Sequence, residues 1–351
     1  MNSSDTSSQT VGVIGAGSFG TAMANLLSAN RPVLLYARRA EVAEEIMETR
    51  RYKGRVFNDN IRVTQYLEEI AQECELIFPV VPSQNFRTMI QNLSPFLRPY
   101  HKIIHGTKGL DVQIPEGKSL QEVEILSRSE VKTMSEVILE ETIALRVGCV
   151  AGPNLAKEIA EGQPAATVVA SHFDEVIREG QNALRSSNFR VHGNHDLFGI
   201  ELTGVLKNIM AIASGISEGL GYGHNTRAML ITRGLAEMIY IGQAMGANVK
   251  AFLGMAGIGD LVATCSSPNS RNFSVGFRLA QGETLGEIIE SMDEVAEGVN
   301  TISIIRALSN HFRITAPISV TLYKILFEGM EIDRGMRLLM EFPFTEDVEF
   351  I

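Results

Sequence analysis

The stretch VGVIGAGSFG, residues 11–20, decides the fold. A short apolar run leads directly into the pattern G-x-G-x-x-G, and an amphipathic segment from Phe19 to Asn30 follows. This order predicts a strand, a tight turn and a helix. Gly15 would permit the turn, Gly17 would let the backbone approach a pyrophosphate, and Gly20 would let helix and strand pack closely. We predict a dinucleotide site here, against the alternative of a glycine-rich turn without a ligand.

Further β-branched runs alternate with amphipathic stretches through the first half of the chain. Strands separated by helical segments predict right-handed crossovers and a mostly parallel sheet, the pattern of an α/β Rossmann-type domain. The predicted strands are Val11–Ile14, Val33–Tyr36, Leu76–Val81, His101–His105, Val147–Val150 and Ala166–Ala170.

The hydrophobic pattern changes after about residue 195, where no strand-like alternation remains and the periodicity is helical. We therefore predict a tail at residues 1–10, a Rossmann-type domain at 11–197 and an all-helical C-terminal domain at 198–351. The predicted helices of the second domain are Thr203–Glu218, Arg227–Met245, Ser274–Ala280, Leu285–Met292, Thr301–Asn310 and Ile318–Phe327.

Composition excludes several classes of protein. With 351 residues, 45% of them hydrophobic, and no apolar run long enough to cross a bilayer, a soluble two-domain protein is expected. The net charge of -10 argues against nucleic-acid binding. The polar N-terminus lacks an export signal, so a cytoplasmic location is expected. Cys74, Cys149 and Cys265 fit a reducing compartment, as buried small hydrophobic residues.

The end of the second predicted strand bears on the choice of dinucleotide. NAD-selective folds usually carry an acidic residue there, on the ribose 2′-hydroxyl. This sequence has Arg38 and Arg39 instead, with no acid until Glu41. Guanidinium groups suit a 2′-phosphate by charge and shape, so NADP is favoured over NAD. The alternative is that both arginines are ordinary solvated side chains at a strand end.

The helical segment Leu202–Ser217 carries a single charge, Lys207, among apolar and small residues. Thr203, Gly204 and Ser214 share its helical face, as the wall of a pocket would require. A buried ammonium has a lowered pKa and can exchange a proton with a substrate oxygen near neutral pH. The alternative is an ordinary solvated lysine.

Two downstream turns carry polar groups suited to a ligand. The glycine-rich turn Gly254–Gly259 presents Asp260, which would either orient Lys207 or cap the helix beginning at Leu261. The polar cluster from Ser266 to Phe273 opens another helix, where N–H groups and Arg271 would make an anion socket. The alternative for this cluster is an ordinary capped helix with an exposed Arg271.

Taken together, these segments resemble the NAD(P)-dependent glycerol-3-phosphate dehydrogenases, from Val11 to about Leu339. The motifs that carry the resemblance are GAGSFGTAMA, VVPSQNFR, TKGL, GPNLAKEIAEG, GVLKNIMAIASGISEGLGYGHNTRAMLITRGLAEM, MAGIGDLVATC, SRNFSVG and VAEGVNT. The resemblance implies a Rossmann domain, a helical domain, usually a homodimer, and interconversion of dihydroxyacetone phosphate with sn-glycerol 3-phosphate for glycerophospholipid synthesis.

The same resemblance assigns roles by position, with Lys207 as the proton donor and acceptor. Lys108 and Asp260 would act beside it. Substrate-contacting positions are Lys108, Gly152, Asn154, Lys207, Asn208, Asp260, Ser270, Arg271 and Asn272. Nucleotide-contacting positions are Gly15, Gly17, Ser18, Phe19, Gly20, Arg38, Arg39, Lys108, Ala156, Arg271, Val295 and Glu297.

Three features depart from the family pattern. Pro79 lies inside a predicted strand, where a backbone donor is normally needed. Asn154 stands where the family often carries Thr or Ser, and the segment from Asp111 to Arg146 is longer than usual. None of them touches the predicted proton chemistry of Lys207.

No metal is expected, because the seven histidines are scattered and no cluster has ligand spacing; His224 is expected to be solvated. An alternative enzyme is a reductase of a carboxylated ketone, of the β-hydroxyacid or ketopantoate type, in which Arg271 would hold a carboxylate. A second alternative is a nucleotide-sensing module without turnover, which the acidic balance disfavours.

Overall fold

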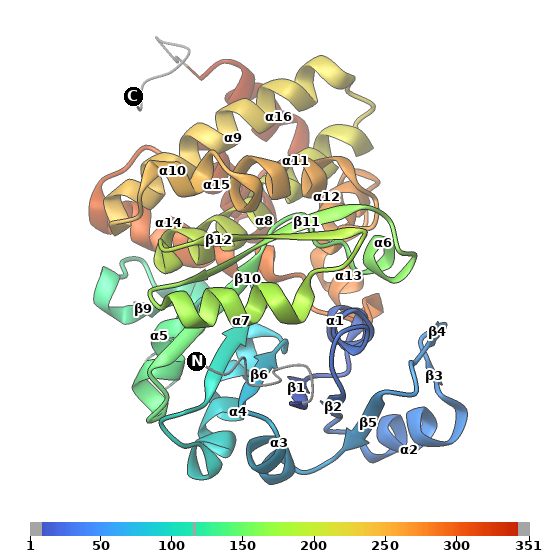
Figure 1. Cartoon of the computed structure of the whole chain (residues 1–351). Coiled ribbons are helices and arrows are strands. Elements are labelled where there is room, and N and C mark those ends of the chain that lie inside the picture. The colour runs from blue at the N-terminus through green and yellow to red at the C-terminus, as the bar shows by residue number, and fades with distance from the viewer. Residues whose placement is uncertain (1–8, 115–116, 343–351) are drawn as a thin grey trace. The chain divides into compact units, whose positions relative to one another are not determined.

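The structure is a computed structural model that describes residues 9–114 and 117–342. The tail predicted at residues 1–10 lies, as far as residue 8, outside the described residues. The chain divides into two compact units (Figure 1). Unit 1 comprises Met1–Thr107 and Met134–Leu197, and unit 2 comprises Lys108–Thr133 and Phe198–Ile351.

Unit 1 is built on an eight-stranded sheet with the order β12-β11-β10-β7-β6-β1-β2-β5. Every neighbouring pair is parallel except β10 and β11, so the predicted mostly parallel sheet is confirmed. The strands are β1 Val11–Ile14, β2 Val33–Tyr36, β5 Ile61–Thr64, β6 Leu76–Pro79, β7 Lys102–His105, β10 Arg146–Ala151, β11 Ala165–Ser171 and β12 Phe189–Asn194.

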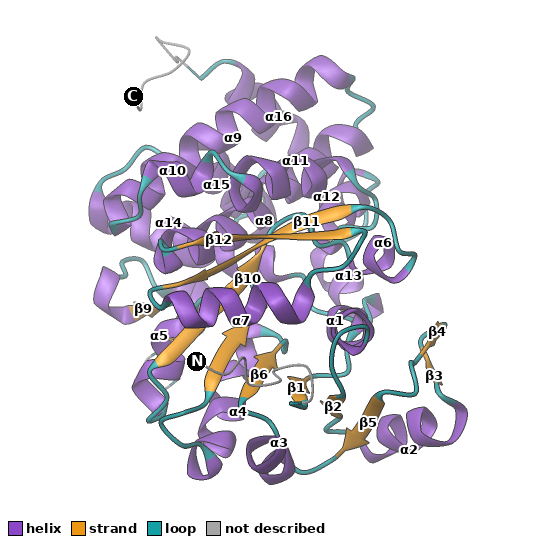
Figure 2. Cartoon of the chain, in the orientation of Figure 1, coloured by secondary structure: helices purple, strands orange, loops and turns teal. Residues whose placement is uncertain are grey.

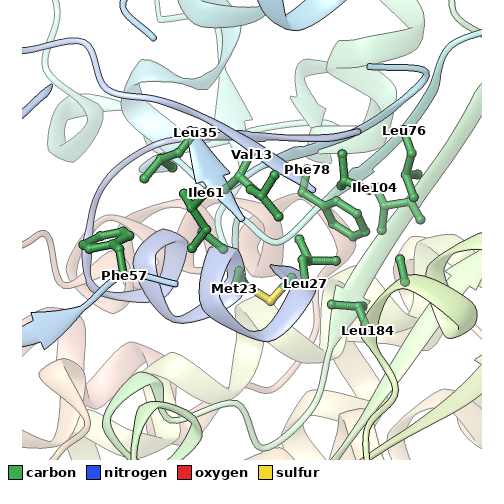
Figure 3. Packing of buried hydrophobic residues seen from close by; sticks show 14 of the residues in the cluster. Val13, Met23, Leu27, Leu35, Phe57, Ile61, Leu76, Phe78, Ile104 and Leu184 are labelled. Carbon is green, nitrogen blue, oxygen red and sulfur yellow. The ribbon is translucent and has the colours of Figure 1, made fainter. Parts of the chain in front are cut away.

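Helices cover both faces of this sheet (Figure 2). One core joins β1, β2, β5 and β6 to α1, α2 and α7, with Met23, Leu27 and Leu184 against Val13 and Phe78 (Figure 3). A second core joins the opposite face to α3, α4 and α5. The helices are α1 Ser18–Ser28, α2 Ala40–Thr49, α3 Leu67–Glu73, α4 Phe86–Leu93, α5 Met134–Glu141, α6 Ala156–Ala160 and α7 Asp174–Leu184, with 3₁₀ turns at Ser83–Asn85 and Ser94–Phe96 and a hairpin of β3 Arg51–Tyr52 and β4 Arg55–Val56.

The chain reverses its direction of winding at β1, which lies between β2 and β6. Ligands of open α/β sheets bind beyond the carboxyl ends of the strands at such a switch point. Pro79 ends β6 here. The pairing of β6 with β1 continues to Pro79, while its register with β7 ends at Ile77. The Pro79 carbonyl accepts a hydrogen bond from Gly106 N at 2.9 Å. The missing N–H of Pro79 therefore falls where the β6–β7 ladder has already ended.

Unit 2 is helical apart from one two-stranded ribbon, as the predicted second domain requires. Its long central helix is α8, Leu197–Gly219, whose first residue lies at the end of unit 1. The other elements are β8 Asp111–Val112, β9 Val131–Lys132, α9 His224–Met245, α10 Val249–Phe252, a π-helix at Met255–Gly259, α11 Asp260–Ser266, α12 Arg271–Ala280, α13 Leu285–Ser291, α14 Glu297–Phe312, α15 Pro317–Phe327 and α16 Ile332–Met340, with 3₁₀ turns at Leu120–Glu122 and Arg128–Glu130.

Helices α8 and α12 touch backbone to backbone at two glycines. A Cβ on Gly215 would lie 2.0 Å from Phe273 O, and a Cβ on Gly276 would lie 2.0 Å from Ile212 O. No side chain fits at either position, because real Cβ atoms do not approach that closely. The glycines thus fix the distance between α8, which carries Lys207, and the N-terminus of α12.

Residues 108–133, which the sequence assigned to the first domain, belong to unit 2. The described part of this segment packs along α14 and α15. Leu126 N donates to Ala307 O at 3.3 Å, and Tyr323 Oη donates to Gln121 O at 3.0 Å. The two ends of the segment meet in the antiparallel pairing of β8 with β9. These contacts explain the grouping, because the segment after Thr107 packs on helices that lie far ahead in the sequence.

No apolar run long enough to cross a bilayer was expected from the sequence, but one helix among the described residues, α8, is long and apolar enough to do so. However, 94% of its most apolar window is buried inside the protein. Length and apolarity are weak evidence for a span here, because the central helix of a soluble domain has the same properties.

Candidate active site and nucleotide-binding loop

The glycine loop of unit 1 leaves no room for side chains at two of its three glycines. Gly15 has a φ of +120°, and a Cβ there would lie 2.9 Å from Val80 O. A Cβ on Gly20 would lie 1.8 Å from Gly15 O. Gly17 is the N-cap residue of α1, with no side-chain cap. The loop is therefore a bare backbone turn at the start of a helix, where an anion is favoured.

Ser18 and Phe19 follow this loop in the first turn of α1. A Cβ on Gly106 would lie 2.8 Å from the Phe19 ring, so the ring lies against the backbone after β7. The Ser18 carbonyl accepts hydrogen bonds from Thr21 and Arg55. Arg55 comes from the hairpin of β3 and β4, and it adds positive charge beside the glycine loop. Sequence reasoning missed Arg55, because only the hairpin brings it to α1.

The two arginines after β2 have different surroundings. Arg39 precedes α2, donates to Tyr52 Oη at 2.8 Å and lies 3.7 Å from the Glu41 carboxylate. Arg38 is exposed, and its guanidinium has no hydrogen bond or ion pair within residues 9–114 and 117–342. Arg38 is thus the arginine whose donors are open to a ligand.

Gly152, Asn154 and Ala156 follow β10 in unit 1. Gly152 has a φ of +144°, and a Cβ there would lie 3.1 Å from Thr167 Cα. Asn154 Nδ2 donates to Thr167 Oγ1 at 2.8 Å, while the buried Asn154 Oδ1 has no partner within the described ranges. Helix α6 begins at Ala156 and packs against α1, the helix of the glycine loop.

Unit 2 brings the predicted catalytic side chains together in a lysine–aspartate cluster, made of Lys108, Lys207, Asn208, Asp260 and Thr264. Asp260 Oδ2 lies 2.7 Å from Lys108 Nζ, and Asp260 Oδ1 lies 3.3 Å from Lys207 Nζ. Lys207 Nζ also donates to Thr264 Oγ1 at 2.7 Å and to Asn208 Oδ1 at 3.4 Å. Thr264 in turn donates to Asp260 Oδ1 at 3.0 Å. Asp260 therefore bridges two ammonium groups.

Burial shifts the titration of the central lysine. Lys207 is only 4% exposed, and burial lowers its pKa from the ordinary 10.5 to about 8. The Asp260 carboxylate opposes this effect, and the Lys108 ammonium adds to it. The burial predicted for Lys207 is thus confirmed. With a pKa of about 8, its ammonium can gain or lose a proton close to neutral pH.

The turn before α11 aims Asp260 at the lysines. The π-helix Met255–Gly259 leads directly into α11, and a Cβ on Gly257 would lie 2.0 Å from Phe252 O. Gly259, and not Asp260, is the N-cap residue of α11, and both Asp260 oxygens lie beside lysine ammonium groups, so of the two alternatives the structure favours contact with Lys207 over capping. Thr264 lies one turn later and was missed by sequence reasoning, although its i+4 spacing from Asp260 was a usable signal.

Helix α12 presents the remaining predicted residues of unit 2. Ser270 is its N-cap and accepts from Phe273 N, while Arg271 is 47% exposed at the side chain and contacts Val295 O at 3.0 Å and Glu294 at 3.4 Å. Asn272 Oδ1 accepts a hydrogen bond from Gly298 N at 2.9 Å, and Gly298 directly follows Glu297. A Cβ on Gly298 would lie 2.8 Å from Asn208 O, so the start of α14 joins α12 to the lysine–aspartate cluster.

The other titratable residues that the sequence singled out lie apart from this cluster or are inert. His224 is exposed at the first turn of α9. All three cysteines are buried, as predicted. Burial raises the pKa of Cys265, beside Thr264, to about 12, so this thiol stays protonated. In the part of the chain that the structure describes, no three His, Cys, Asp or Glu side chains are grouped as metal ligands.

Comparison with known proteins identifies the family. The N-terminal and C-terminal domains of NAD-dependent glycerol-3-phosphate dehydrogenase match residues 10–177 and 196–337. The chain is 42% identical to the glycerol-3-phosphate dehydrogenase [NAD(P)+] of Pseudomonas entomophila, over 99% of this chain and 98% of that protein. It is 40% identical to the corresponding protein of Ectopseudomonas mendocina, over 98% of this chain and 97% of that protein.

A solved structure agrees with these matches. The glycerol-3-phosphate dehydrogenase of Coxiella burnetii superimposes with a TM-score of 0.85 at 30% identity, covering 95% of this chain and 99% of that chain. The resemblance drawn from the motifs is therefore confirmed, together with its two-part fold. This chain belongs to the family of NAD-dependent glycerol-3-phosphate dehydrogenases, which are oxidoreductases.

Proposed function

We propose that the protein reduces dihydroxyacetone phosphate reversibly to sn-glycerol 3-phosphate, with NADPH favoured over NADH and Lys207 as the proton donor and acceptor. The observation that carries the proposal is the buried Lys207 ammonium, 3.3 Å from Asp260 and 2.7 Å from Thr264. Family membership supports the reaction, since the relatives are named glycerol-3-phosphate dehydrogenase [NAD(P)+].

The residues of unit 1 fit a dinucleotide. The backbone turn at Gly15 and Gly20 is packed too closely for any side chain, and its bare N–H groups lie at the start of α1. These groups would hold the pyrophosphate, and the open guanidinium of Arg38 would hold a 2′-phosphate. Ser18, Phe19, Arg39 and Ala156 would complete the nucleotide site. The bound nicotinamide supplies the hydride; the rest of the chemistry belongs to the side chains.

In unit 2, Lys207 would deliver a proton to the oxygen that gains charge during reduction. Its three N–H groups face Asp260, Thr264 and Asn208, and the contact to Asn208 is the longest, at 3.4 Å. That contact is the one a substrate oxygen would replace. Asp260 would keep the ammonium oriented, and Lys108 would add positive charge where the oxygen becomes negative.

The phosphate end of the substrate would bind at the first turn of α12. Ser270, Arg271 and Asn272 lie there, and a helix N-terminus with a guanidinium group favours a dianion. Gly152 and Asn154, in unit 1, would contribute substrate contacts, and Val295 and Glu297 would contribute nucleotide contacts. We also propose that the protein is a cytoplasmic homodimer that works in glycerophospholipid synthesis. Light scattering of the purified protein can test whether it is a dimer.

A substrate comparison tests the reaction. Oxidation of NADPH and of NADH, followed by absorbance, is expected with dihydroxyacetone phosphate and not with ketopantoate. Turnover of ketopantoate at a higher kcat/KM would contradict the proposal and favour the carboxylated-ketone alternative. Cofactor binding without any turnover of either ketone would favour the sensing module.

The cofactor preference is tested at Arg38. Replacing Arg38 with Ala removes a charge-assisted contact of about 2 kcal/mol, so the KM for NADPH should rise by about 30-fold while the KM for NADH changes little. Arg178→Ala, on the exposed face of α7, is the matched control and should change neither value. An unchanged KM for NADPH in the Arg38 variant would refute the 2′-phosphate role.

A further inference from the structure

We propose that Thr203 and Ser214 are positioning residues, whose hydroxyl groups clamp α8 to the segment 255–266 and so set the contact between Lys207 and Asp260. Both side chains are fully buried. The Thr203 hydroxyl lies 3.1 Å from Ala256 O, and the Ser214 hydroxyl donates to Cys265 O at 2.8 Å. The inference rests on the proposed function of Lys207.

The two clamps lie on either side of the catalytic contacts. Thr203, Lys207 and Ser214 are spaced i, i+4 and i+11, so they share one face of α8. Their partners follow in the same order along the facing segment, first Ala256, then Asp260 and Thr264, then Cys265. A slide or rotation of either segment would therefore break a clamp before it could change the distance between Lys207 and Asp260.

The carbonyls that the clamps use are ones that a helix alone holds poorly. Cys265 lies in the last turn of α11, where carbonyl groups have no partner within the helix. Ala256 lies in the π-helix, a rare element that needs outside support. The Thr203 proton is shared with Ile200 O at 2.8 Å, within its own helix. The hydroxyl therefore joins one backbone carbonyl of each segment, and the apolar residues around it cannot replace this contact.

Small changes in the alignment of α8 with the segment 255–266 should alter catalysis more than substrate binding. The charged groups that face Lys207 are Asp260 and Lys108, and the Cys265 thiol is the other titratable group that acts on it. The distance to Asp260 governs how firmly Lys207 holds its proton, while the phosphate of the substrate would bind elsewhere, at α12. A loosened clamp should therefore lower kcat and move its pH dependence, with little change in the KM for dihydroxyacetone phosphate.

The test compares Thr203→Val, Thr203→Ser and Ser214→Ala. The valine variant keeps the shape and loses the hydroxyl, so kcat should fall by about tenfold and its pH midpoint should move by about half a unit, with KM within about twofold. The serine variant keeps the hydroxyl and should retain wild-type kcat and pH midpoint. Ser214→Ala should change both values in the same direction as Thr203→Val.

Ser217→Ala is the matched control. Ser217 is a buried serine of the same helix, and its hydroxyl has no hydrogen-bond partner in the described part of the chain. Wild-type kcat and pH midpoint in Ser217→Ala support the clamp. Equal losses in Ser217→Ala and Ser214→Ala would overturn it, as would an unchanged kcat and pH midpoint in Thr203→Val. Those results would leave the role of Lys207 intact, whereas an active Lys207→Ala would refute the proposed function itself.

Discussion

Two of the charged side chains that are buried in the helices of unit 2, Lys207 and Glu237, are stabilised in different ways. Lys207 of α8 has one carboxylate, one hydroxyl and one amide oxygen around its ammonium. Glu237 of α9 accepts hydrogen bonds from Ile318 N, Ser319 N and Ser319 Oγ at 2.7, 2.9 and 2.6 Å. Glu237 therefore satisfies the first N–H groups of α15, a role that a carboxylate fills well at a helix N-terminus.

The comparison teaches that burial and a shifted pKa do not by themselves identify a catalytic group. Burial raises the pKa of Glu237 to about 7 and lowers that of Lys207 to about 8, so both would titrate near neutral pH. The difference lies in the partners. Lys207 faces side chains that a ligand could replace, whereas two of the three donors to Glu237 are backbone N–H groups that α15 cannot give up. We therefore assign chemistry to Lys207 and stability to Glu237.

The largest expected effect is on activity, and it separates the role of Lys207 from that of Glu237. Lys207→Ala removes the proposed proton donor, so kcat for reduction of dihydroxyacetone phosphate should fall by about 100- to 10,000-fold. Glu237→Gln is the matched variant and should keep wild-type kcat in the same absorbance assay. Wild-type turnover in the Lys207 variant would refute the catalytic assignment, and a similar loss in both variants would erase the distinction between the two buried charges.

The second effect concerns stability and its dependence on pH. The folded pKa of Glu237, about 7, lies above its ordinary value of 4.5. Such a group stabilises the fold fully below pH 4.5, and this stabilisation is lost as pH rises through 7. The free energy of unfolding of the wild type, relative to Glu237→Gln, should therefore fall by about 3 kcal/mol between pH 4.5 and pH 8.

Urea unfolding at several pH values measures this difference. The exposed Glu290 of α13 provides the control, since Glu290→Gln should give a difference that is flat over the same pH range. A flat difference for Glu237→Gln as well would show that the three donors to the carboxylate outweigh its burial, and the pKa direction assigned to Glu237 would be wrong.

The smallest effect is a displacement of the pH profile. With Lys207 as the proposed proton donor, reduction needs its protonated form, so kcat should fall as pH rises through about 8. Because the Asp260 carboxylate raises the pKa of Lys207, Asp260→Asn should move this falling limb to lower pH, by about one unit. Glu237→Gln should leave the limb in place. A limb that stays fixed in Asp260→Asn would show that another group titrates.

Much of the fold could be predicted, because its signals are local in the sequence. The buried strands β1 and β2 are continuous apolar runs and were found. The edge strands β5 and β12 were missed, since each alternates with exposed residues and resembles a loop in its composition. Sequence patterns identify a strand that is buried on both faces, and they miss a strand at the solvent-exposed edge of the sheet.

The candidate site divides in the same way. Lys207 could be found from the sequence because an isolated charge in an apolar helix is unusual, and Asp260 because a glycine turn presents it. Thr264 and Arg55 were missed, since their contacts depend on how separate segments pack. The packing of residues 108–133 on α14 could not be read locally either, because the hydrogen bonds that hold them join positions almost two hundred residues apart.

The close backbone contacts at Gly215 and Gly276 also limit how the enzyme could be redesigned. The main chains touch there, so no larger residue can be introduced to tilt α12 and reshape the turn at Ser270 without also pushing α8 aside. An engineer who wishes to admit a bulkier ketone must therefore exchange side chains at the tips of these helices. The crossing therefore constrains both the proposed phosphate site at the start of α12 and the position of Lys207 on α8.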